Sequence, residues 1–523
     1  MGKKPFKITY STLGADVEKF HKAFDRAVEK VKAKLGQTYP HLINNQEVAG
    51  TGQIMASDSP VDTRLTLANF HHATVEEMQA AVQAAKQAFV NWGTTDYRER
   101  AKLVRRAAKL VRKNRYELAA IMSLEVGKNR FESMGDAEES ADLMDYYAEQ
   151  LLEAEGFSMP LGRLSPNERT RSVLRPYGVW AVISPFNFPL ALPAGMTAGA
   201  LLGGNTVVFK PSKETLWTGY KLAEIYRDAG LPEGVFNFIA GDREIGQKLV
   251  AHPDLDGIVF TGSKPVGMNL FHGFSKNYIK PVIVEMGGKN PAIVMPSAEM
   301  DMAAEGVMKS AFGLQGQKCS ACSRVYVHEK VKDEFMALLL EKTGKLAIGD
   351  PSQRDVYMGP VIHKKAQEKF TATAKTAQDG GGKILHGGRV LKDGIYAHGY
   401  YVEPTIVDGL PPTHQLFLDE LFLPFLAVAS VNSLEEAIQL SNRAEYGLTA
   451  GLFSNKKKEI QYFFDHIEAG VTYVNRRSGA TTGAWPGVNS FCGWKGSGGS
   501  GKGGCGPYYV QQFMREQSRT VMK

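Results

Sequence analysis

The sequence predicts an α/β protein in which parallel sheets are joined by helical crossovers. Short β-rich runs alternate with helical stretches from residue 178 to residue 288, and a second alternating block runs from residue 290 to about residue 475. Such alternation is typical of parallel strands, because each return to the next strand is made through a helix. The chain has 523 residues, which predicts roughly two to four domains and a large buried core.

The part of the chain before residue 178 is predicted to be mainly helical. We interpret residues 1–38 as a polar arm with an amphipathic helix. Apolar residues at helical spacing predict helices over 75–90, 98–123 and 136–153. Residues 157–178 are turn-rich and then strand-like, which predicts a projecting hairpin.

The first alternating block contains the clearest strand and helix signals. Strands are expected over 178–186, 205–211, 234–241, 257–262 and 281–288. Helices are expected over 214–229, 243–251 and from about 264. The second block begins with a strand over 290–295, and the end of the chain is first glycine-rich and then strand-like.

A long uncharged segment raises the alternative of a membrane span. No charged residue occurs between Tyr177 and Phe209, and that length could cross a bilayer. Pro185, Pro189 and Pro193 interrupt the segment, so a buried strand, a loop and a helix fit it better. We therefore expect no membrane association.

Composition and charge argue against several further classes. The net charge is +7, and the most basic stretch, 102–115, has apolar residues at helical spacing, so we interpret it as a solvated helix face and expect no nucleic-acid partner. Four cysteines in so long a chain argue against a disulfide scaffold and for a reducing compartment. The first residues lack an apolar signal-peptide core, and residues 13–35 contain the acids Asp16, Glu18, Asp25 and Glu29, which a transit peptide would lack. We therefore expect a cytoplasmic protein.

The segment 312–324 contains a candidate nucleophile. Cys319 follows a glycine-bounded loop at the edge of an element, where a lowered pKa or a nearby base could make the thiol reactive. Two alternatives stay open from spacing alone. Cys319 could be a small buried apolar residue, or half of a zinc or dithiol site together with Cys322. Because neither a second CxxC nor a group of histidines lies nearby, we expect no metal.

Two polar residues occupy apolar surroundings in the sequence. Asn187, between Pro185 and Pro189, could cap the following helix or donate its amide to a developing oxyanion, an interaction worth ~3 kcal/mol. Glu285 follows an apolar run and precedes two glycines. It could be a salt-bridged carboxylate at a strand end or a general base that faces a cleft.

Polar groups also follow two predicted strands, at Lys210 and around Ser263. The carboxyl ends of such strands are where open α/β sheets bind nucleotides, and a helix N-terminus attracts anions. Residues 496–503 nearly match a phosphate-binding P-loop, but Gly503 replaces the hydroxyl residue that binds Mg²⁺ and no apolar strand precedes them. We interpret them as a flexible connector.

Six segments together resemble the aldehyde dehydrogenase superfamily, in the same order along roughly residues 40–520. They are PFNFP, GNTVVFKPS, FTGSxxVG, EMGGKNP, GQKCSA and ELFLPF. The resemblance implies a Rossmann-type nucleotide-binding domain, an α/β catalytic domain and a small β oligomerisation hairpin. The expected boundaries are 1–38 for an N-terminal arm, 39–156 with 179–287 for the dinucleotide-binding domain, 288–488 for the catalytic domain, and 157–178 with 489–523 for the oligomerisation element.

The resemblance implies a covalent mechanism. Cys319 would be the nucleophile, Asn187 with the backbone NH of Cys319 would form the oxyanion hole, and Glu285 would activate water to hydrolyse the thioester. Relatives that pass the acyl group to coenzyme A lack this glutamate, so the expected product is a free carboxylic acid.

The implied cofactor is NAD or NADP. Lys210 and Glu420 would hold its two riboses, Phe422 would pack near the nicotinamide ribose, and Gly262 and Ser263 would face the pyrophosphate. The full set of residues expected to bind it is Ser184, Phe186, Lys210, Ser212, Lys213, Gly241, Gly246, Thr261, Gly262, Ser263, Val266, Glu420 and Phe422.

Cofactor choice depends on the residues that follow Lys210. NAD-preferring relatives often have a glutamate three residues later, where this chain has Lys213 with Glu214 next. A cation there would accept a 2′-phosphate. We hypothesise that NADP⁺ is used at least as well as NAD⁺.

Within the superfamily, the loop 316–324, the helical segment 125–150 and residues 482–488 resemble the branch that oxidises L-glutamate γ-semialdehyde to glutamate in proline degradation. The resemblance implies that backbone NH groups of Gly483, Ala484 and Ser320 hold the substrate α-carboxylate, since small residues allow close approach. Phe188 and Phe491 are also expected at the substrate. The alternative is a dehydrogenase for another semialdehyde or an aliphatic aldehyde.

Some features depart from the family pattern. About three extra residues precede Thr482, and Ser478, Gly479 and Ala480 offer a second possible anchor. Leu423, Cys492 and Phe186 replace the usual glycine, glycine and tryptophan. The hairpin at 157–178 and the tail beyond residue 500 predict pairing of edges between subunits, and so a homodimer or a higher homo-oligomer.

Overall fold

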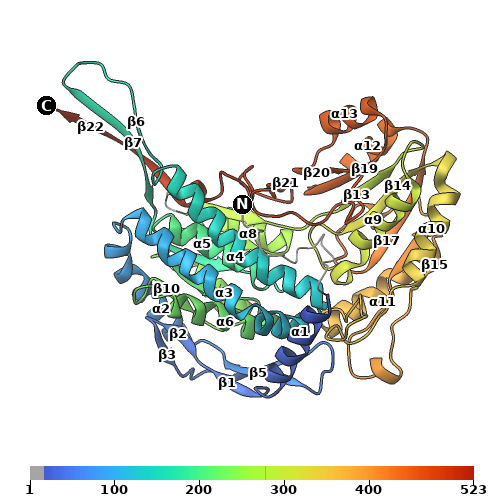
Figure 1. The fold of residues 1–523 in the computed structure, drawn as a ribbon, viewed down its shortest axis with the longest axis horizontal. Helices are drawn as coiled ribbons and strands as arrows, with labels where there is room; N and C mark the ends of the chain where they lie inside the picture. The colour runs from blue at the N-terminus through green and yellow to red at the C-terminus, as the bar shows by residue number, and fades with distance from the viewer. Residues whose placement is uncertain (1–16, 277) are drawn as a thin grey trace.

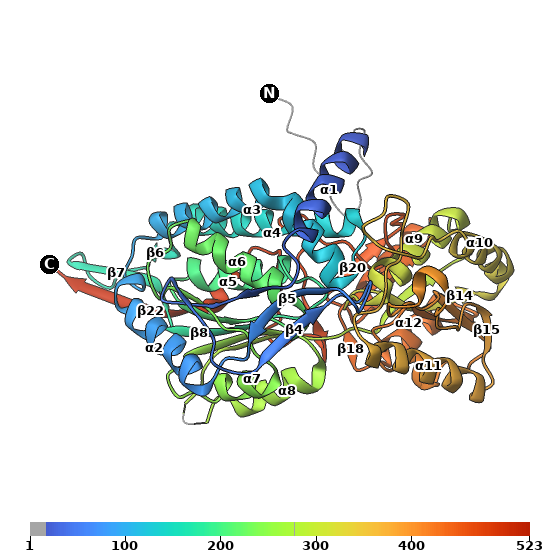
Figure 2. The same cartoon turned by 90° about the horizontal axis from the view of Figure 1, so that it is seen from below.

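The computed structural model describes residues 17–276 and 278–523, and it places two seven-stranded sheets side by side (Figures 1 and 2). Three smaller sheets accompany them. Helices cover both faces of each large sheet, so the predicted α/β class is confirmed. Residues 1–16, part of the predicted N-terminal arm, lie outside the described residues.

The first large sheet contains the strands of the first alternating block. Five neighbouring strands are parallel, and the last two pair antiparallel at one edge. Its order is β12 (Val282–Glu285), β11 (Gly257–Thr261), β8 (Val179–Ile183), β9 (Thr206–Lys210), β10 (Phe236–Phe238), β2 (His41–Ile43) and β3 (Gln46–Val48).

Side chains of β8 show why both faces of this sheet are covered. Val179 and Ala181 pack in one apolar cluster, while Trp180 and Val182 pack in another. Alternating residues point to opposite faces, and a strand that is apolar on both must be buried on both. The first cluster contains α2 (Val75–Trp92) and α7 (Arg243–Val250), with α8 (Lys264–Gly273) beside it. The second contains α3 (Tyr97–Val126), α4 (Arg130–Glu153), α5 (Ala191–Leu202) and α6 (Leu216–Asp228), and α1 (Val17–Lys32) packs on α3.

The second large sheet has the same plan, with a single antiparallel pair at its β15 edge. Its order is β15 (Lys383–His386), β16 (Thr405–Asp408), β17 (Phe425–Val431), β14 (Cys322–His328), β13 (Asn290–Val294), β19 (Thr449–Phe453) and β20 (Val471–Val474). One face is covered by α9 (Met300–Phe312) and α10 (Lys332–Gly344), and the other by α11 (Lys364–Asp379), α12 (Leu434–Asn442) and α13 (Lys457–His466). The chain changes sheet between β12 and β13, and the domain boundaries themselves stay a prediction.

A narrow antiparallel sheet projects from the body beside α4 (Figure 1). It pairs β6 (Ser158–Pro160), β7 (Glu168–Pro176) and the C-terminal strand β22 (Met514–Met522), with β7 in the middle. The two remaining sheets pair β1 (Gln37–Tyr39), β5 (Thr66–His71) and β4 (Ile54–Asp58), and β18 (Tyr446–Gly447) with β21 (Trp494–Lys495). Short 3₁₀ turns are η1 (Lys213–Thr215), η2 (Gly313–Gly316), η3 (Glu329–Val331), η4 (Gly394–Tyr396), η5 (Gln415–Phe417) and η6 (Val510–Phe513).

Helix α4 begins six residues before the predicted start at residue 136. The Asn129 side chain accepts hydrogen bonds from the NH groups of Phe131 and Glu132. Capping of this kind satisfies donors that a helix start leaves unpaired. The helix therefore begins at its cap, before its apolar periodicity becomes visible in the sequence.

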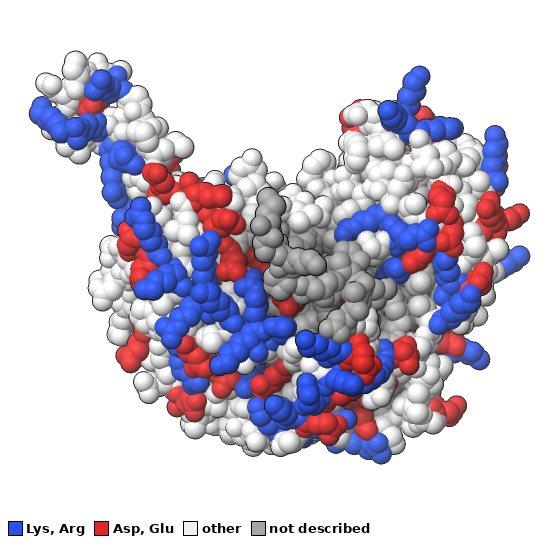
Figure 3. Space-filling model, in the orientation of Figure 1, with Lys and Arg blue, Asp and Glu red and all other residues white. Residues whose placement is uncertain are grey.

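The long uncharged segment forms β8, α5 and β9 in succession. Within residues 17–276 and 278–523, every helix is too short or too polar to span a bilayer. On the face that carries α3 and α4, Lys and Arg side chains are interspersed with Asp and Glu (Figure 3). The basic stretch of α3 is thus part of a mixed-charge surface on that face.

Candidate active site

The nucleophile loop joins η2 to β14 and carries Cys319. Leu314 and Gln315, just before it, have φ of 48° and 56°, a left-handed conformation that costs side-chain-bearing residues roughly 1–3 kcal/mol. The Glu132 carboxylate accepts from the NH of Leu314 at 3.1 Å, and the Gln315 amide donates to the Gly127 carbonyl at 3.2 Å. These bonds hold the strained loop against α4 and the end of α3.

Asn187 lies between β8 and α5 and is 3% exposed. Its Nδ2 donates to the carbonyl of Gln317, two residues before Cys319, at 3.0 Å. One of its two amide hydrogens is thus committed to the nucleophile loop, and the other can serve an oxyanion.

Glu285 is the last residue of β12, and it lines the same cavity as Cys319, whose volume is about 510 Å³. Its Oε2 is buried and has no hydrogen-bond partner among the described residues. Burial raises the pKa of Glu285 to about 8. Burial, reinforced by the negative charges of Glu420 and Glu285, raises the pKa of Cys319 to about 12. Both groups are therefore mainly protonated at neutral pH in this structure.

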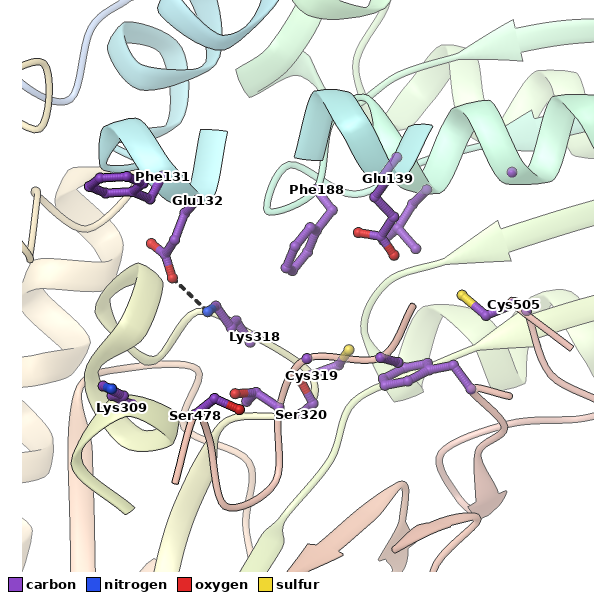
Figure 4. A pocket seen from close by; sticks show the side chains of 18 of the residues that line it. Phe131, Glu132, Glu139, Phe188, Lys309, Lys318, Cys319, Ser320, Ser478 and Cys505 are labelled. Carbon is purple, nitrogen blue, oxygen red and sulfur yellow. Dashed lines mark hydrogen bonds and ion pairs between the residues drawn. The ribbon is translucent and has the colours of Figure 1, made fainter. Parts of the chain in front are cut away.

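All five residues predicted to contact the substrate line the cavity, and Figure 4 shows Phe188 and Ser320 there together with Cys319. The five residues are Phe188, Ser320, Gly483, Ala484 and Phe491. Lys318 also lines the cavity and pairs with Glu132 at 2.6 Å. A cavity lined by apolar side chains and a few polar groups is typical of a small-molecule site.

A buried ion pair contacts Phe188 in the wall of this cavity. The sequence did not indicate this pair. Lys128 and Asp136 are both 0% exposed, and their Nζ and Oδ2 atoms lie 2.6 Å apart. The other carboxylate oxygen of Asp136 accepts from the NH of Ala191 at 2.7 Å. The Lys128 Nζ lies 3.8 Å from the centroid of the Phe188 ring. Because charged side chains usually face water, only the folded contacts could show that this pair is buried.

Lys210 ends β9 on the side predicted to bind the cofactor. Its buried Nζ donates to the carbonyls of Pro211 and Gly241, both at 2.9 Å, and burial lowers its pKa to about 8. A Cβ at Gly246 would lie 3.1 Å from the Lys210 side chain. Ser212 follows, and its hydroxyl donates to the Glu214 carboxylate at 2.5 Å. Lys213 between them is exposed.

The turn after β11 forms the adjoining part of this edge. Thr261 lines the cavity, and the NH of Gly262 donates to the Glu285 carbonyl at 3.0 Å. Ser263 is the N-cap residue of α8, and its side chain makes no capping hydrogen bond. Val266, one turn into α8, is 39% exposed.

The loop before β17 meets the same edge from the second sheet. Glu420 accepts from the NH of Gly288 at 2.9 Å, and a Cβ at Gly287 would lie 2.1 Å from its carboxylate. Phe422 has φ of 60° and packs edge-on against Phe186, with ring centroids 5.8 Å apart. Neither Glu420 nor Phe422 lines the substrate cavity.

Residues 496–503 do not have P-loop geometry. Gly498 bridges to Glu285, and no helix begins at residue 503. Cys319 and Cys322 are free thiols. In the part of the chain that the structure describes, no three His, Cys, Asp or Glu side chains are grouped to hold a metal.

The sequence pattern of the aldehyde dehydrogenase family matches residues 48–519. The chain belongs to the aldehyde dehydrogenase family. The predictions of family, fold and enzyme class are thereby confirmed, and the roles assigned to individual residues stay predictions.

Several relatives of this aldehyde dehydrogenase carry one name. It is 36% identical to a 1-pyrroline-5-carboxylate dehydrogenase of Staphylococcus aureus over 500 residues, covering 94% of this chain and 95% of the relative. It is 37% identical over 506 residues to 1-pyrroline-5-carboxylate dehydrogenase 2 of Bacillus subtilis, covering 95% of both chains. Its fold matches the 1-pyrroline-5-carboxylate dehydrogenase from Thermus with bound NAD at a TM-score of 0.93 and 32% identity, over 100% of both chains.

Proposed function

We propose that this aldehyde dehydrogenase oxidises L-glutamate γ-semialdehyde to L-glutamate, with NAD⁺ or NADP⁺ as the oxidant. The observation that carries the proposal is a single cavity that is lined by Cys319 and Glu285 and also by Gly483 and Ala484. A thiol nucleophile and backbone NH groups that can bind a carboxylate in one cavity fit an aldehyde that also carries a carboxylate. The names of the relatives support the same substrate.

The reaction begins when the Cys319 thiol releases its proton to water and the sulfur bonds to the aldehyde carbon. The aldehyde oxygen becomes an oxyanion, which the Asn187 amide and the Cys319 NH stabilise. The C=O double bond re-forms as hydride leaves the carbon, and the product is a thioester on Cys319. When bound, the oxidised nicotinamide supplies a hydride acceptor.

Glu285 acts in the second half of the reaction. It takes a proton from water, whose oxygen bonds to the thioester carbon, and the C–S bond breaks to release the acid and the Cys319 thiol. The partnerless, buried Oε2 of Glu285 fits a base that must have a free lone pair in the cavity.

The residues at the edge formed by β9, β11 and the Glu420 loop are suited to bind a dinucleotide. Ser184 is 4% exposed, and its hydroxyl has no partner among the described residues. The space that Gly246 leaves beside Lys210 would be filled by a Cβ. Lys210 and Glu420 would hold the riboses, and Gly262 with Ser263 would face the pyrophosphate. The exposed Lys213 would accept a 2′-phosphate, so NADP⁺ is proposed to serve at least as well as NAD⁺.

We further propose a cytoplasmic homodimer or a higher assembly of dimers. The projecting sheet β22–β7–β6 supports it, because β22 leaves a nine-residue edge, of which eight residues are exposed. A long free edge of this kind pairs readily with another chain.

The test measures NADH and NADPH formation by the purified protein with L-glutamate γ-semialdehyde, succinic semialdehyde and propanal. A kcat/KM for the glutamate aldehyde at least ~30-fold above the others, ~2 kcal/mol of discrimination, is expected. Comparable values for all three would keep the enzyme class and reject the substrate.

A further inference from the structure

Arg476 lies at the start of the loop that contains the extra residues. Its guanidinium donates to the carbonyl of Thr482 at 2.8 Å and also to the carbonyl of Gly483. It stacks on the Tyr473 ring, 4.5 Å from the centroid. One side chain thus binds two successive peptide units of the proposed carboxylate anchor.

The bonds of Arg476 fix the direction of two NH groups. The Thr482 carbonyl shares a peptide unit with the NH of Gly483, and the Gly483 carbonyl shares one with the NH of Ala484. In a trans peptide, carbonyl and NH point in opposite directions, and the chain has no cis bond among the described residues. Both NH groups therefore point away from Arg476, and neither donates to any described residue.

The other candidate anchor has its NH groups occupied. The NH of Gly479 donates to the Arg476 carbonyl at 3.3 Å, and that of Ala480 to the Gly306 carbonyl at 2.9 Å. Thr481 then ties the loop to the nucleophile loop, because its hydroxyl donates to the Ser320 carbonyl at 2.6 Å. Residues 479–481 are thus structural attachments, whereas the NH groups of Gly483 and Ala484 donate to no described residue.

We infer that Arg476 is a positioning residue that determines specificity for aldehydes carrying a carboxylate. It binds the carbonyls that would repel an anion, and it turns the paired NH groups toward the substrate. Its charge also lies behind these dipoles and favours an anion. This inference rests on the proposed function.

Gly483 is part of the same arrangement. Its φ is 97°, which residues with side chains rarely adopt. A Cβ there would lie 2.9 Å from the Arg476 guanidinium. The glycine therefore allows both the turn and the approach of the arginine.

The experiment compares Arg476→Met with Arg477→Met. Arg477 is its exposed neighbour, which pairs with Glu299, Asp301 and Glu305 on α9 and its cap. The readouts are KM and kcat for L-glutamate γ-semialdehyde and propanal, and the inhibition constant of L-glutamate. Methionine keeps the stem against Tyr473 and removes the donors.

Arg476→Met is expected to raise the KM for the glutamate aldehyde and the inhibition constant of glutamate at least ~10-fold, as expected for the loss of charge-assisted bonds. Its kcat/KM for propanal should stay within about 3-fold of wild type. Arg477→Met should leave KM and kcat unchanged for both aldehydes. Equal losses with both aldehydes, or no loss with either, would overturn the inference.

Arg476→Lys separates positioning from direct charge. A lysine keeps the charge but lacks the planar fork that binds two carbonyls, so it is expected to behave like methionine. Wild-type KM in the lysine variant would show that the charge alone suffices and would reject positioning. A wild-type enzyme with no preference for the glutamate aldehyde would instead reject the proposed function.

Discussion

The two sides of Cys319 are built in different ways. On the cofactor side, Lys210, Thr261 and Glu285 are the last residues of β9, β11 and β12, three parallel strands of the first large sheet. On the substrate side, residues 475–491 form no helix or strand and are held by hydrogen bonds from side chains to backbone groups. Sheet register places the first set, while the second depends on individual contacts. Strand order alone therefore places Lys210, Thr261 and Glu285, whereas the arrangement of residues 475–491 depends on loop contacts.

The largest expected effect is at the residue that both sides share. Cys319→Ala should lower kcat on the order of 10⁴-fold or more, because the covalent step is lost. Steady-state NADH formation measures it. Cys322→Ala, in the same segment but 1% exposed and turned to the Arg324 carbonyl, is the matched control and should retain activity.

Loss of the base at the strand end should come next. Glu285→Gln should lower the hydrolytic rate ~10²–10⁴-fold and leave thioester on Cys319, detectable by mass spectrometry after acid quench. Because burial raises the pKa of Glu285 to about 8, the base form is gained as pH rises. The kcat of the wild type should thus increase as the pH is raised through about 8. The kcat of the Gln variant should not show this increase. The same increase of kcat with pH in both proteins would show that another group is the base.

Substitution in the buried pair Lys128–Asp136 tests whether the substrate side can be disrupted while the cofactor side stays intact. Lys128→Met leaves a buried carboxylate without its partner and should destabilise the protein by ~3–5 kcal/mol, measured by denaturant unfolding. The folded variant should lose activity on aldehydes while its NAD⁺ dissociation constant stays unchanged. Arg112→Met, which breaks partly exposed pairs with Asp142 and Asp145, should cost about 1 kcal/mol or less for each pair. An equal loss of unfolding free energy in both variants would contradict the expectation that the buried pair contributes more than the partly exposed pairs.

The smallest expected effect is confined to the cofactor side. Lys213→Glu should raise the KM for NADP⁺ roughly 10-fold through the lost attraction for a 2′-phosphate, with little change for NAD⁺. The KM for the aldehyde should not move. An unchanged NADP⁺ KM would remove Lys213 from the cofactor site.

Several local errors of the sequence analysis share one physical cause. Strand ends were placed within a few residues, because buried parallel strands are marked by apolar runs. The start of α4 was missed because the Asn129 cap determines it. Leu314 and Gln315 have left-handed backbones that only tertiary bonds to Glu132 and Gly127 maintain, and no residue preference indicates them.

The fold class, the family and the candidate reactive residues could all be predicted from the sequence. Periodicity and glycine-bounded motifs are local properties, so they can be recognised without the three-dimensional structure. The tertiary structure alone decided which charges are buried, as at Lys128 and Asp136, and which NH groups stay free, as at Gly483 and Ala484. Burial and hydrogen-bond satisfaction depend on segments far apart in the chain: Ser310 and Ser320 must first be brought to Thr481 before the donors of that residue are occupied.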